Sequence, residues 1–519
     1  MRATSKLPDD WRRLLQGYAL RNDNLFFFRL SLTTNHCLQT TSYCLLVLSL
    51  RSSSKCSARP WSSKLDRGAR LTHLSYFLQS TSYSPMNYLQ LALEESFFSI
   101  GVSRPNPAVG AVVVKDGIVV GRGRTQRPGN AHAEVMALRD AGELARGAAI
   151  YVTLEPCCHY GRTPPCTKAI IDAGITEVYF AHADPNPVVR GKSRKILEDA
   201  GIAVYEGEDA CIRACFCDET ENDLHASSDV SCECGVFGYG SAYGNDVGGP
   251  GSEEFKAEGR SVFHEVERYF EAYDYFVCNK RTFVEIKSAV SEDGFMGRVA
   301  ADGRYAPLKI TGQGANCWNH ELRAMSDAVL VGAGTLLADN PRLDVRYAQG
   351  NNPVKIVWAG HHEFTLDEIR TLTVFTLSSA PCGENAPADR PLVFSCVAQP
   401  QLDGIAEVVS LPHESFADNW NFMVENLSAR GMHRLMVEPG AGLAREIFNS
   451  PQEPEKPLWN RLDLWRSTDP SVEASLGHLI DCGEAKCGLE FPGLPSCAIA
   501  KESAMIGPDV LTVYYGGEP

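Results

Sequence analysis

The sequence lacks an excess of basic residues and any apolar stretch long enough to span a membrane. It contains 49 Lys and Arg against 64 Asp and Glu, which gives a net charge of −15 and a pI near 5.4. Such an acidic balance argues against nonspecific binding to nucleic acid, although a small phosphorylated ligand needs only a local basic cluster. The run TSYCLLVLSL is too short to cross a bilayer. We therefore expect neither nucleic acid nor a membrane as a partner.

Cysteine is abundant, but it does not indicate a disulfide scaffold. The chain has 18 cysteines in 519 residues, and disulfide-stabilised domains are far shorter. This length allows two or three domains with ample cores. Five cysteines cluster at Cys211, Cys215, Cys217, Cys232 and Cys234. A second metal site is conceivable there, but free thiols in a loop are the favoured interpretation.

A split metal-ligand signature is the most informative motif of the chain. His132-Ala-Glu134 is followed by Cys157 in the run TLEPCCHYGRTPPC, which ends at Cys166. One imidazole and two thiolates supply three ligands, and zinc prefers four, so one position is left for water. Zinc deaminases combine such ligands with a glutamate that moves protons, in the signature H-x-E followed by P-C-x-x-C. We predict a zinc site held by His132, Cys157 and Cys166, with Glu134 as the catalytic acid and base.

Two other interpretations of this motif stay open. The three residues could be ordinary buried side chains, or Cys158 or His159 could complete a structural zinc site with four protein ligands. The surrounding pattern favours catalysis. His132 and Cys166 each lie at the start of a predicted helix, and Cys157 follows a predicted strand. A helix start favours a thiolate ligand and a bound hydroxide because of the helix dipole.

Several segments resemble a known family. PNPAVGAVVVKDG, AHAEVMALR, YVTLEPCCHYGRTPPC and DPNPVVRGK are similar to the deaminase domain of the bifunctional riboflavin-biosynthesis deaminase–reductases. The GRTPPC insertion between the thiolates separates this family from cytidine and tRNA-adenosine deaminases. The alternation of helix and strand suits a cytidine-deaminase-like three-layer α/β/α domain. The resemblance also implies that Asn106 and His159 contact the pyrimidine.

Residues 1–85 differ in composition from the rest of the chain. They contain twelve Lys and Arg, four Asp and no Glu, and they are rich in Ser and Thr, which is typical of a transit peptide. The family's chains typically begin as this chain does at Met86, so a misplaced start codon competes with that interpretation. In either case we expect an unstructured extension outside the fold. The expected location is cytoplasmic, or plastid if the extension is a genuine transit peptide.

The second half resembles the family's reductase domain, whose fold is like that of dihydrofolate reductase. The matching segments are KSAVSEDGF, LRAMSDAVLVGAGTLLADNPRLDVR and RLMVEPGAGLA. The last two each predict a buried strand, a glycine-containing turn and a helix start, and two such turns suit the phosphates of a dinucleotide. We expect a deaminase domain over residues 86–220, a linker or insertion over residues 221–275 and a reductase domain over residues 276–519.

The resemblance implies two sets of site residues in this second domain, and two departures put its activity in question. Lys309 stands where the family usually has tryptophan, and Pro439 replaces a glycine and has no N–H for a phosphate. The expected substrate contacts are Lys287, Arg323, Leu343, Arg346 and Glu438. The expected NADPH contacts are Val290, Thr335, Asp339, Gly440, Ala441, Gly442, Leu443 and Ala444.

The resemblance implies a bifunctional enzyme of riboflavin biosynthesis that uses zinc and NADPH. A zinc-dependent hydrolysis would remove the 2-amino group of 2,5-diamino-6-ribosylamino-4(3H)-pyrimidinone 5′-phosphate. An NADPH-dependent step would then reduce the ribosyl group to ribitylamino. The alternatives are a deaminase with a vestigial reductase domain, and a nucleoside or tRNA deaminase. A small phosphorylated pyrimidine is the expected partner, and a homo-oligomer is compatible with the sequence.

Overall fold

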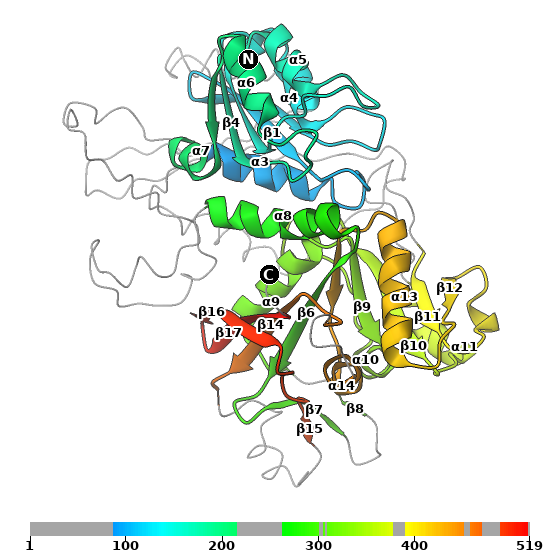
Figure 1. Ribbon diagram of the computed structural model, residues 1–519. Coiled ribbons are helices and arrows are strands. Elements are labelled where there is room, and N and C mark those ends of the chain that lie inside the picture. Colours follow the sequence, from blue (N-terminus) through cyan, green and yellow to red (C-terminus); the bar gives the residue numbers. More distant parts are fainter. Residues whose placement is uncertain are drawn as a thin grey trace, which may run out of the picture. The chain divides into compact units, whose positions relative to one another are not determined.

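The computed structural model describes residues 87–214, 262–299, 305–306, 309–376, 390–450, 457–469 and 488–516 (Figure 1). The predicted extension over residues 1–85, most of the predicted linker and four of the five clustered cysteines lie outside these residues. The fifth, Cys211, is a buried free thiol. In the described part of the chain, no helix is both long and apolar enough to cross a bilayer.

The N-terminal domain, residues 87–214, is built on a five-stranded sheet in the order β2-β1-β3-β4-β5. β1 pairs antiparallel with β2 and β3, whereas β3, β4 and β5 run parallel. Asp116 and Gly117 have φ angles of 50° and 73° in the hairpin turn between β1 and β2, a turn type that favours an Asp-Gly pair. The elements are α3 (Tyr88–Phe97), β1 (Gly110–Lys115), β2 (Ile118–Arg124), α4 (Ala133–Ala141), η1 (Gly142–Ala145), β3 (Ala149–Leu154), α5 (Cys166–Ala173), β4 (Glu177–His182), α6 (Lys192–Asp199), β5 (Ala203–Glu206) and α7 (Gly207–Arg213).

Helices cover both faces of this sheet. A Cβ atom on Gly110 would meet the backbone of α3, and a Cβ atom on Gly123 would meet the backbone of α4. Gly123 pairs with Ala111, the neighbour of Gly110, so the two glycines face opposite sides of the sheet. Helix α5 packs beside α4. The predicted three-layer α/β/α arrangement is therefore confirmed.

Gly123→Ala is expected to destabilise this domain. The new Cβ atom would lie 2.2 Å from the carbonyl oxygen of Ala133 and 2.2 Å from the amide nitrogen of Ala137, so α4 would have to move. Overpacking of this kind costs about 1–3 kcal/mol. Thermal unfolding of the purified variant measures the loss. Gly442→Ala is a matched control because a Cβ atom there meets nothing within 4 Å, and equal destabilisation by both substitutions would contradict the close approach.

Helix α8 (Val262–Asn279) begins inside the predicted linker or insertion, so the last part of that segment, residues 262–275, is helical. Its buried residues include Val266, Tyr269, Phe270 and Tyr273, which follow the i, i+3, i+4, i+7 pattern of a helix packed along one face. The Gly- and Ser-rich composition of the preceding segment obscured this pattern in the sequence.

The C-terminal domain is built on a nine-stranded sheet in the order β12-β11-β10-β9-β13-β6-β14-β17-β16. The strands from β12 to β14 are parallel, and β17 and β16 are antiparallel. A small sheet has the order β15-β7-β8. The elements are β6 (Phe283–Val290), β7 (Phe295–Val299), β8 (Tyr305–Ala306), α9 (Gln313–Ala324), β9 (Ala328–Gly332), α10 (Ala333–Asp339), β10 (Val354–Gly360), α11 (Leu366–Thr371), α12 (Thr373–Thr376), β11 (Leu392–Ser395), η4 (Pro400–Leu402), β12 (Glu407–Ser410), α13 (Phe416–Ala429), β13 (Arg434–Val437), α14 (Ala441–Asn449), β14 (Arg461–Ser467), β15 (Gly488–Glu490), β16 (Ala498–Ile506) and β17 (Asp509–Gly516).

Buried charges attach α8 to this second sheet. Arg268 of α8 donates Nη2 to Asp463 of β14 at 3.2 Å. Arg434 of β13 donates Nη2 to the carbonyl oxygen of Arg268 at 2.7 Å and pairs with Glu285 of β6. The side chains of Asp463, Glu285 and Arg434 are at most 1% exposed. These bonds fix α8 against the middle of the nine-stranded sheet.

The same helix is attached to the N-terminal domain through His182, the last residue of β4. Its Nδ1 lies 2.5 Å from Glu267 and its Nε2 lies 2.9 Å from Asp274, both on α8. Its ring stacks on Phe270 with centroids 5.1 Å apart. Burial lowers the pKa of His182, but the hydrogen bonds with Asp274 and Glu267 outweigh burial and raise it to about 9. Helix α8 is thus shared by both domains.

Candidate functional site

Three loops of the N-terminal domain lie at the same end of its sheet: one leads into β1, and the other two follow β2 and β3. β1 pairs antiparallel with both β2 and β3, so it begins where they end. Just after β2, the N–H of Thr125 donates to the carbonyl oxygen of Val109 at 2.9 Å. The loops that carry Asn106, His132 and Cys157 therefore leave from the same edge, although these residues are far apart in the sequence.

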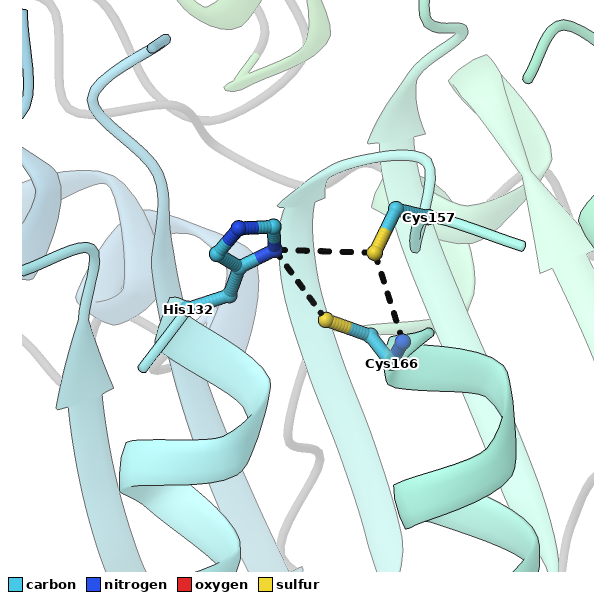
Figure 2. Close-up of side chains that lie close together, drawn as sticks. All are labelled: His132, Cys157 and Cys166. Atoms are coloured by element: carbon cyan, nitrogen blue, oxygen red, sulfur yellow. Dashed lines mark hydrogen bonds between the residues drawn. The ribbon is translucent and has the colours of Figure 1, made fainter. Parts of the chain in front are cut away.

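The predicted metal ligands point toward one another (Figure 2). His132 precedes α4, Cys157 follows β3, and Cys166 begins α5. His132 Nδ1 lies 3.5 Å from Cys157 Sγ and 3.3 Å from Cys166 Sγ. A tetrahedral zinc with bonds of about 2.0–2.3 Å holds nitrogen and sulfur ligands about 3.5 Å apart. The structure brings the three residues together as predicted, and their spacing fits zinc.

In the part of the chain that the structure describes, the group of potential metal ligands consists of His132, Cys157 and Cys166, and it is called the metal group below. Cys158 and His159, the two alternative fourth ligands, are not among them. Cys158 Sγ instead lies 4.0 Å from the carbonyl oxygen of Val188. Three protein ligands leave a coordination position for water. The geometry therefore favours a catalytic over a structural site.

Glu134 lies beside this group in the first turn of α4 and is only 4% exposed. Burial raises its pKa, and its carboxyl group hydrogen-bonds with Cys166. A carboxyl group that is easier to protonate than usual suits proton transfer near neutral pH. A hydrogen bond with Cys157 raises the pKa of His132 to about 9, and a hydrogen bond with Cys166 lowers the pKa of Cys157 to about 4. In this group without a metal, the hydrogen bonds therefore favour a thiolate at Cys157 beside a protonated imidazole at His132.

Glu155 supports the loop of Cys157, a role that sequence analysis missed. Its side chain is 3% exposed and accepts hydrogen bonds from Ser193 Oγ at 2.6 Å and from the N–H of Gly191 at 3.0 Å. The N–H of Glu155 donates to the carbonyl oxygen of His182 at 2.8 Å. These bonds fix the end of β3 to the segment that leads into α6. An acidic residue at the end of an apolar strand, two positions before a metal ligand, was the signal available in the sequence.

The two predicted pyrimidine contacts flank the same end of the sheet. Asn106 lies in the loop before β1 and lines a small cavity with Tyr269 and His433. His159 follows Cys157 by two residues, and among the described residues its buried Nδ1 has no hydrogen-bond partner. An unpartnered buried nitrogen is available to a ligand. Contact of either residue with a pyrimidine stays a prediction.

In the C-terminal domain, the predicted cofactor residues gather where parallel strands end. β9 leads into α10 at Gly332 and β13 leads into α14 at Gly440, and the two strands are neighbours. A Cβ atom on Gly440 would lie 2.4 Å from Thr335 Oγ1, so the two turns approach closely. Residues 441–444 form the first turn of α14, and Val290 ends the next strand, β6. Neither helix start has a side-chain cap, which suits phosphate binding.

Three of the predicted substrate residues form one buried charged group. Arg323 donates Nε and Nη2 to the two carboxylate oxygens of Glu438 at 2.7 Å and 2.9 Å. Burial would raise the pKa of Glu438, but Arg323 outweighs it and lowers that pKa. Burial lowers the pKa of Lys287, whose charged neighbours include Glu438 and Arg323. Arg323 therefore orients a charged Glu438 beside Lys287.

The other predicted residues of this domain lie in different surroundings. Leu343 has a fully buried side chain and a φ angle of 53°, so its backbone is the part left to meet a ligand. Arg346 is 39% exposed and pairs with Asp344. Asp339 is exposed at the end of α10. The structure does not bring Arg346 into the buried charged group.

A cavity of about 530 Å³ adjoins Lys287. Lys309, which stands in place of the expected tryptophan, lines this cavity, so the departure lies at the candidate site itself. Pro439 is buried immediately before Gly440 at the start of α14. Most residues that line the cavity were not among the predicted contacts. The lining consists of Lys287, Ala289, Lys309, Ile310, Thr311, Gly312, Gln313, Asn316, Cys317 and Tyr347.

Two family models match the chain in the predicted order. The cytidine and deoxycytidylate deaminase zinc-binding region matches residues 84–182, and the RibD C-terminal domain matches residues 282–450. The chain is therefore similar to RibD proteins in both of its domains. The metal group lies inside the match to the deaminase zinc-binding region, and the turns at Gly332 and Gly440 lie inside the match to the RibD C-terminal domain. Helix α8 lies between the two matched segments.

Relatives of known name support this placement. The riboflavin biosynthesis protein RibD of Aquifex aeolicus is 36% identical over 272 residues, which cover 52% of this chain and 60% of that protein. The riboflavin biosynthesis protein PYRD, chloroplastic, of Zea mays is 51% identical over 128 residues, which cover 24% of this chain and 33% of that protein. The match to the Aquifex protein thus spans less than two thirds of that relative's length.

A solved structure shares the fold of both domains. The diaminohydroxyphosphoribosylaminopyrimidine deaminase/5-amino-6-(5-phosphoribosylamino)uracil reductase of Thermotoga maritima is 26% identical, with a TM-score of 0.52. The match covers 83% of this chain and 97% of the Thermotoga chain. The predicted pair of folds, cytidine-deaminase-like and dihydrofolate-reductase-like, is therefore confirmed.

Proposed function

We propose that this chain is a bifunctional enzyme of riboflavin biosynthesis. The first reaction hydrolyses the 2-amino group of 2,5-diamino-6-ribosylamino-4(3H)-pyrimidinone 5′-phosphate. The second uses NADPH to reduce the ribosyl group of the product to ribitylamino. The observation that carries the proposal is the group of His132, Cys157 and Cys166 with buried Glu134 beside it. The names of the bacterial and plant relatives support the pathway.

In the first reaction, the N-terminal domain holds the ring and moves protons. His132, Cys157 and Cys166 would hold a zinc ion, which would lower the pKa of a water at the site to about 7. Glu134 takes a proton from the attacking water and passes it to a ring nitrogen. It then moves the proton of the new hydroxyl group to the amine, the carbon–nitrogen bond breaks and ammonia leaves. Each transfer needs a carboxyl group that both gains and loses a proton, which the burial of Glu134 favours.

In the second reaction, the C-terminal domain places cofactor and substrate at the carboxyl ends of its strands. Thr335 and the turn at residues 440–444 would hold the phosphates of NADPH, which would supply a hydride to the ribosyl C1′. Lys287 and Glu438 contact the sugar phosphate, and Arg323 keeps Glu438 charged and oriented. The cavity beside Lys287 gives the substrate room to enter.

An assay of the full chain tests both halves. The purified protein is given the diaminopyrimidine phosphate with and without NADPH, and ammonia release and NADPH oxidation are followed together. We expect ammonia release in both samples and NADPH oxidation only after deamination. Absence of ammonia release from the zinc-loaded protein would refute the deaminase function. Activity on cytidine or tRNA instead would favour a nucleoside or tRNA deaminase.

Two substitutions separate cofactor from substrate binding in the second reaction. Asp339→Ala should mainly raise KM for NADPH. Arg346→Ala should mainly weaken use of the deaminated substrate, by about 1.5–3 kcal/mol if one charged hydrogen-bonded contact is lost. Steady-state kinetics with each reactant varied in turn measure both effects. Ammonia release should be unchanged in both variants, and loss of deamination in either would contradict the assignment to separate sites.

A deaminase with a vestigial reductase domain is the second candidate, and two observations favour it. Lys309 lines the cavity where the family usually has tryptophan, and Pro439 offers no N–H at the start of α14. Direct measurement of NADPH binding decides between the candidates. Saturable binding supports the bifunctional enzyme, and absence of binding in a chain that releases ammonia supports the vestigial one.

The location and assembly of the chain are further parts of the proposal. We place it in the cytoplasm, or in a plastid if residues 1–85 act as a transit peptide. The Zea mays relative, whose name includes the word chloroplastic, supports the second location. Imaging of the full chain fused to a fluorescent protein would decide between them. A homo-oligomer is compatible with the proposal, and light scattering of the purified chain would test it.

A further inference from the structure

The loop that carries Asn106 is held from outside the N-terminal domain. Tyr269 of α8 donates its hydroxyl group to the carbonyl oxygen of Ala108 at 3.0 Å. His433, the residue before β13, has its Nε2 3.1 Å from the carbonyl oxygen of Pro105. A carbonyl oxygen only accepts, so Nε2 of His433 carries the hydrogen. These two carbonyl groups bracket Asn106, and both donors lie beyond the zinc-binding match at residues 84–182.

Other contacts hold the same loop along its length. A Cβ atom on Gly431 would lie 2.7 Å from Cβ of Pro105, so the turn before β13 packs directly on the loop. Asn351 donates Nδ2 to the carbonyl oxygens of Phe98 and Ile100 at 2.8 Å and 3.1 Å. The C-terminal domain therefore contacts the loop near its beginning and again beside Asn106.

The donor side chains of the two bracketing bonds are buried, and the bonds themselves are partly buried. Tyr269 and His433 are each only 8% exposed, and with Asn106 they line one small cavity. Loss of either donor removes the protein partner of its carbonyl group in the loop. The peptide groups on both sides of Asn106 are thus held in place, and this loop leaves the sheet at the same edge as the loops of His132 and Cys157.

We propose that Tyr269 and His433 are positioning residues that hold Asn106 in place for the pyrimidine ring, so that deamination depends on α8 and the C-terminal domain. This role rests on the proposed deaminase function. Neither residue touches the reacting atoms. Each acts on the reaction only through the loop, and its removal should therefore affect substrate binding more than the chemical step.

The test measures ammonia release by the full zinc-loaded chain and by Tyr269→Phe, His433→Phe and His433→Gln. We expect Tyr269→Phe and His433→Phe each to raise KM for the diaminopyrimidine phosphate by about 2- to 12-fold, the range for one hydrogen bond, with a smaller change in kcat. Glutamine keeps an N–H donor, so His433→Gln should recover part of the loss. Tyr275→Phe is a matched control, because it removes a hydroxyl group from the same helix at a ring that packs on Phe283.

Zinc content and thermal unfolding of each variant show whether a change in KM comes from a general loss of structure. The positioning role predicts wild-type zinc content with a raised KM in Tyr269→Phe and His433→Phe. If both variants match the wild type in KM and kcat, the role is overturned while the deaminase function stands. Loss of zinc together with a uniform fall in kcat would also overturn it, in favour of a structural role. A wild-type chain that releases no ammonia would overturn the deaminase function and this role with it.

Discussion

Glu134→Gln is expected to lower ammonia release by at least about 10²–10⁴-fold, the usual contribution of general acid–base catalysis. Glutamine keeps the size and shape of the side chain in the first turn of α4 but cannot carry the proton. Because Glu134 moves protons at more than one stage, the loss should reach at least this range. Ammonia release by the zinc-loaded variant, measured against the wild type, gives the ratio.

The same variant should keep its zinc and its substrate. Glu134 is not one of the three members of the metal group, so zinc content by elemental analysis should equal that of the wild type. Substrate binding by calorimetry should also be nearly unchanged. Near-normal turnover by Glu134→Gln would mean that another group moves the protons, and loss of zinc would mean that the carboxylate is a ligand.

Cys166→Ser should lose its metal and with it all deaminase activity. Cys166 is fully buried at the start of α5, and its Sγ lies 3.3 Å from His132 Nδ1. A serine hydroxyl group has no thiolate to offer, and two protein ligands remain. The loss in zinc affinity should exceed the roughly 10–100-fold seen when a residue that only orients a ligand is replaced. Titration with zinc against a competing chelator measures it.

Cys158→Ser is the matched control for this experiment. Cys158 lies eight residues before Cys166, outside the metal group, with its Sγ near the carbonyl oxygen of Val188. It should bind zinc as the wild type does. If both serine variants lost zinc equally, the site would have four protein ligands, and a structural role would replace the catalytic one. X-ray absorption that shows one nitrogen and two sulfur ligands would agree with the present assignment.

The elements around the metal group were predictable because their signals are local. Asp116-Gly117 marks a hairpin turn, Gly142 and Gly174 end two helices, and the ligands lie directly at helix starts or after a strand. Helix α8 was missed because its apolar pattern follows a Gly- and Ser-rich segment that suggested a linker throughout. The buried orientation of Leu343 was also not predictable, because a motif match does not reveal which way a side chain points.

Contacts between residues far apart in the sequence were the part of the site that was hardest to predict. The Arg323–Glu438 pair joins residues 115 positions apart, and the bond from Tyr269 to Ala108 joins residues 161 positions apart. No periodicity or spacing in the sequence relates such residues, because the packing of α8 and of the two sheets brings them together. The sequence thus predicted candidate catalytic and ligand-binding residues, but it did not predict which other residues position them.

Helix α8 has a consequence for how the two halves of this chain can be separated. A break before residue 262 would remove the carboxylates that hold His182 and the hydroxyl group that holds Ala108. A break after residue 279 would remove Arg268 and leave Asp463 buried with one fewer counter-charge, which is a costly change. Neither end of α8 is therefore a position at which the two domains can be separated without loss of buried contacts. If one domain loses its activity during evolution, we expect substitutions in its site while its fold is kept, rather than deletion of the domain.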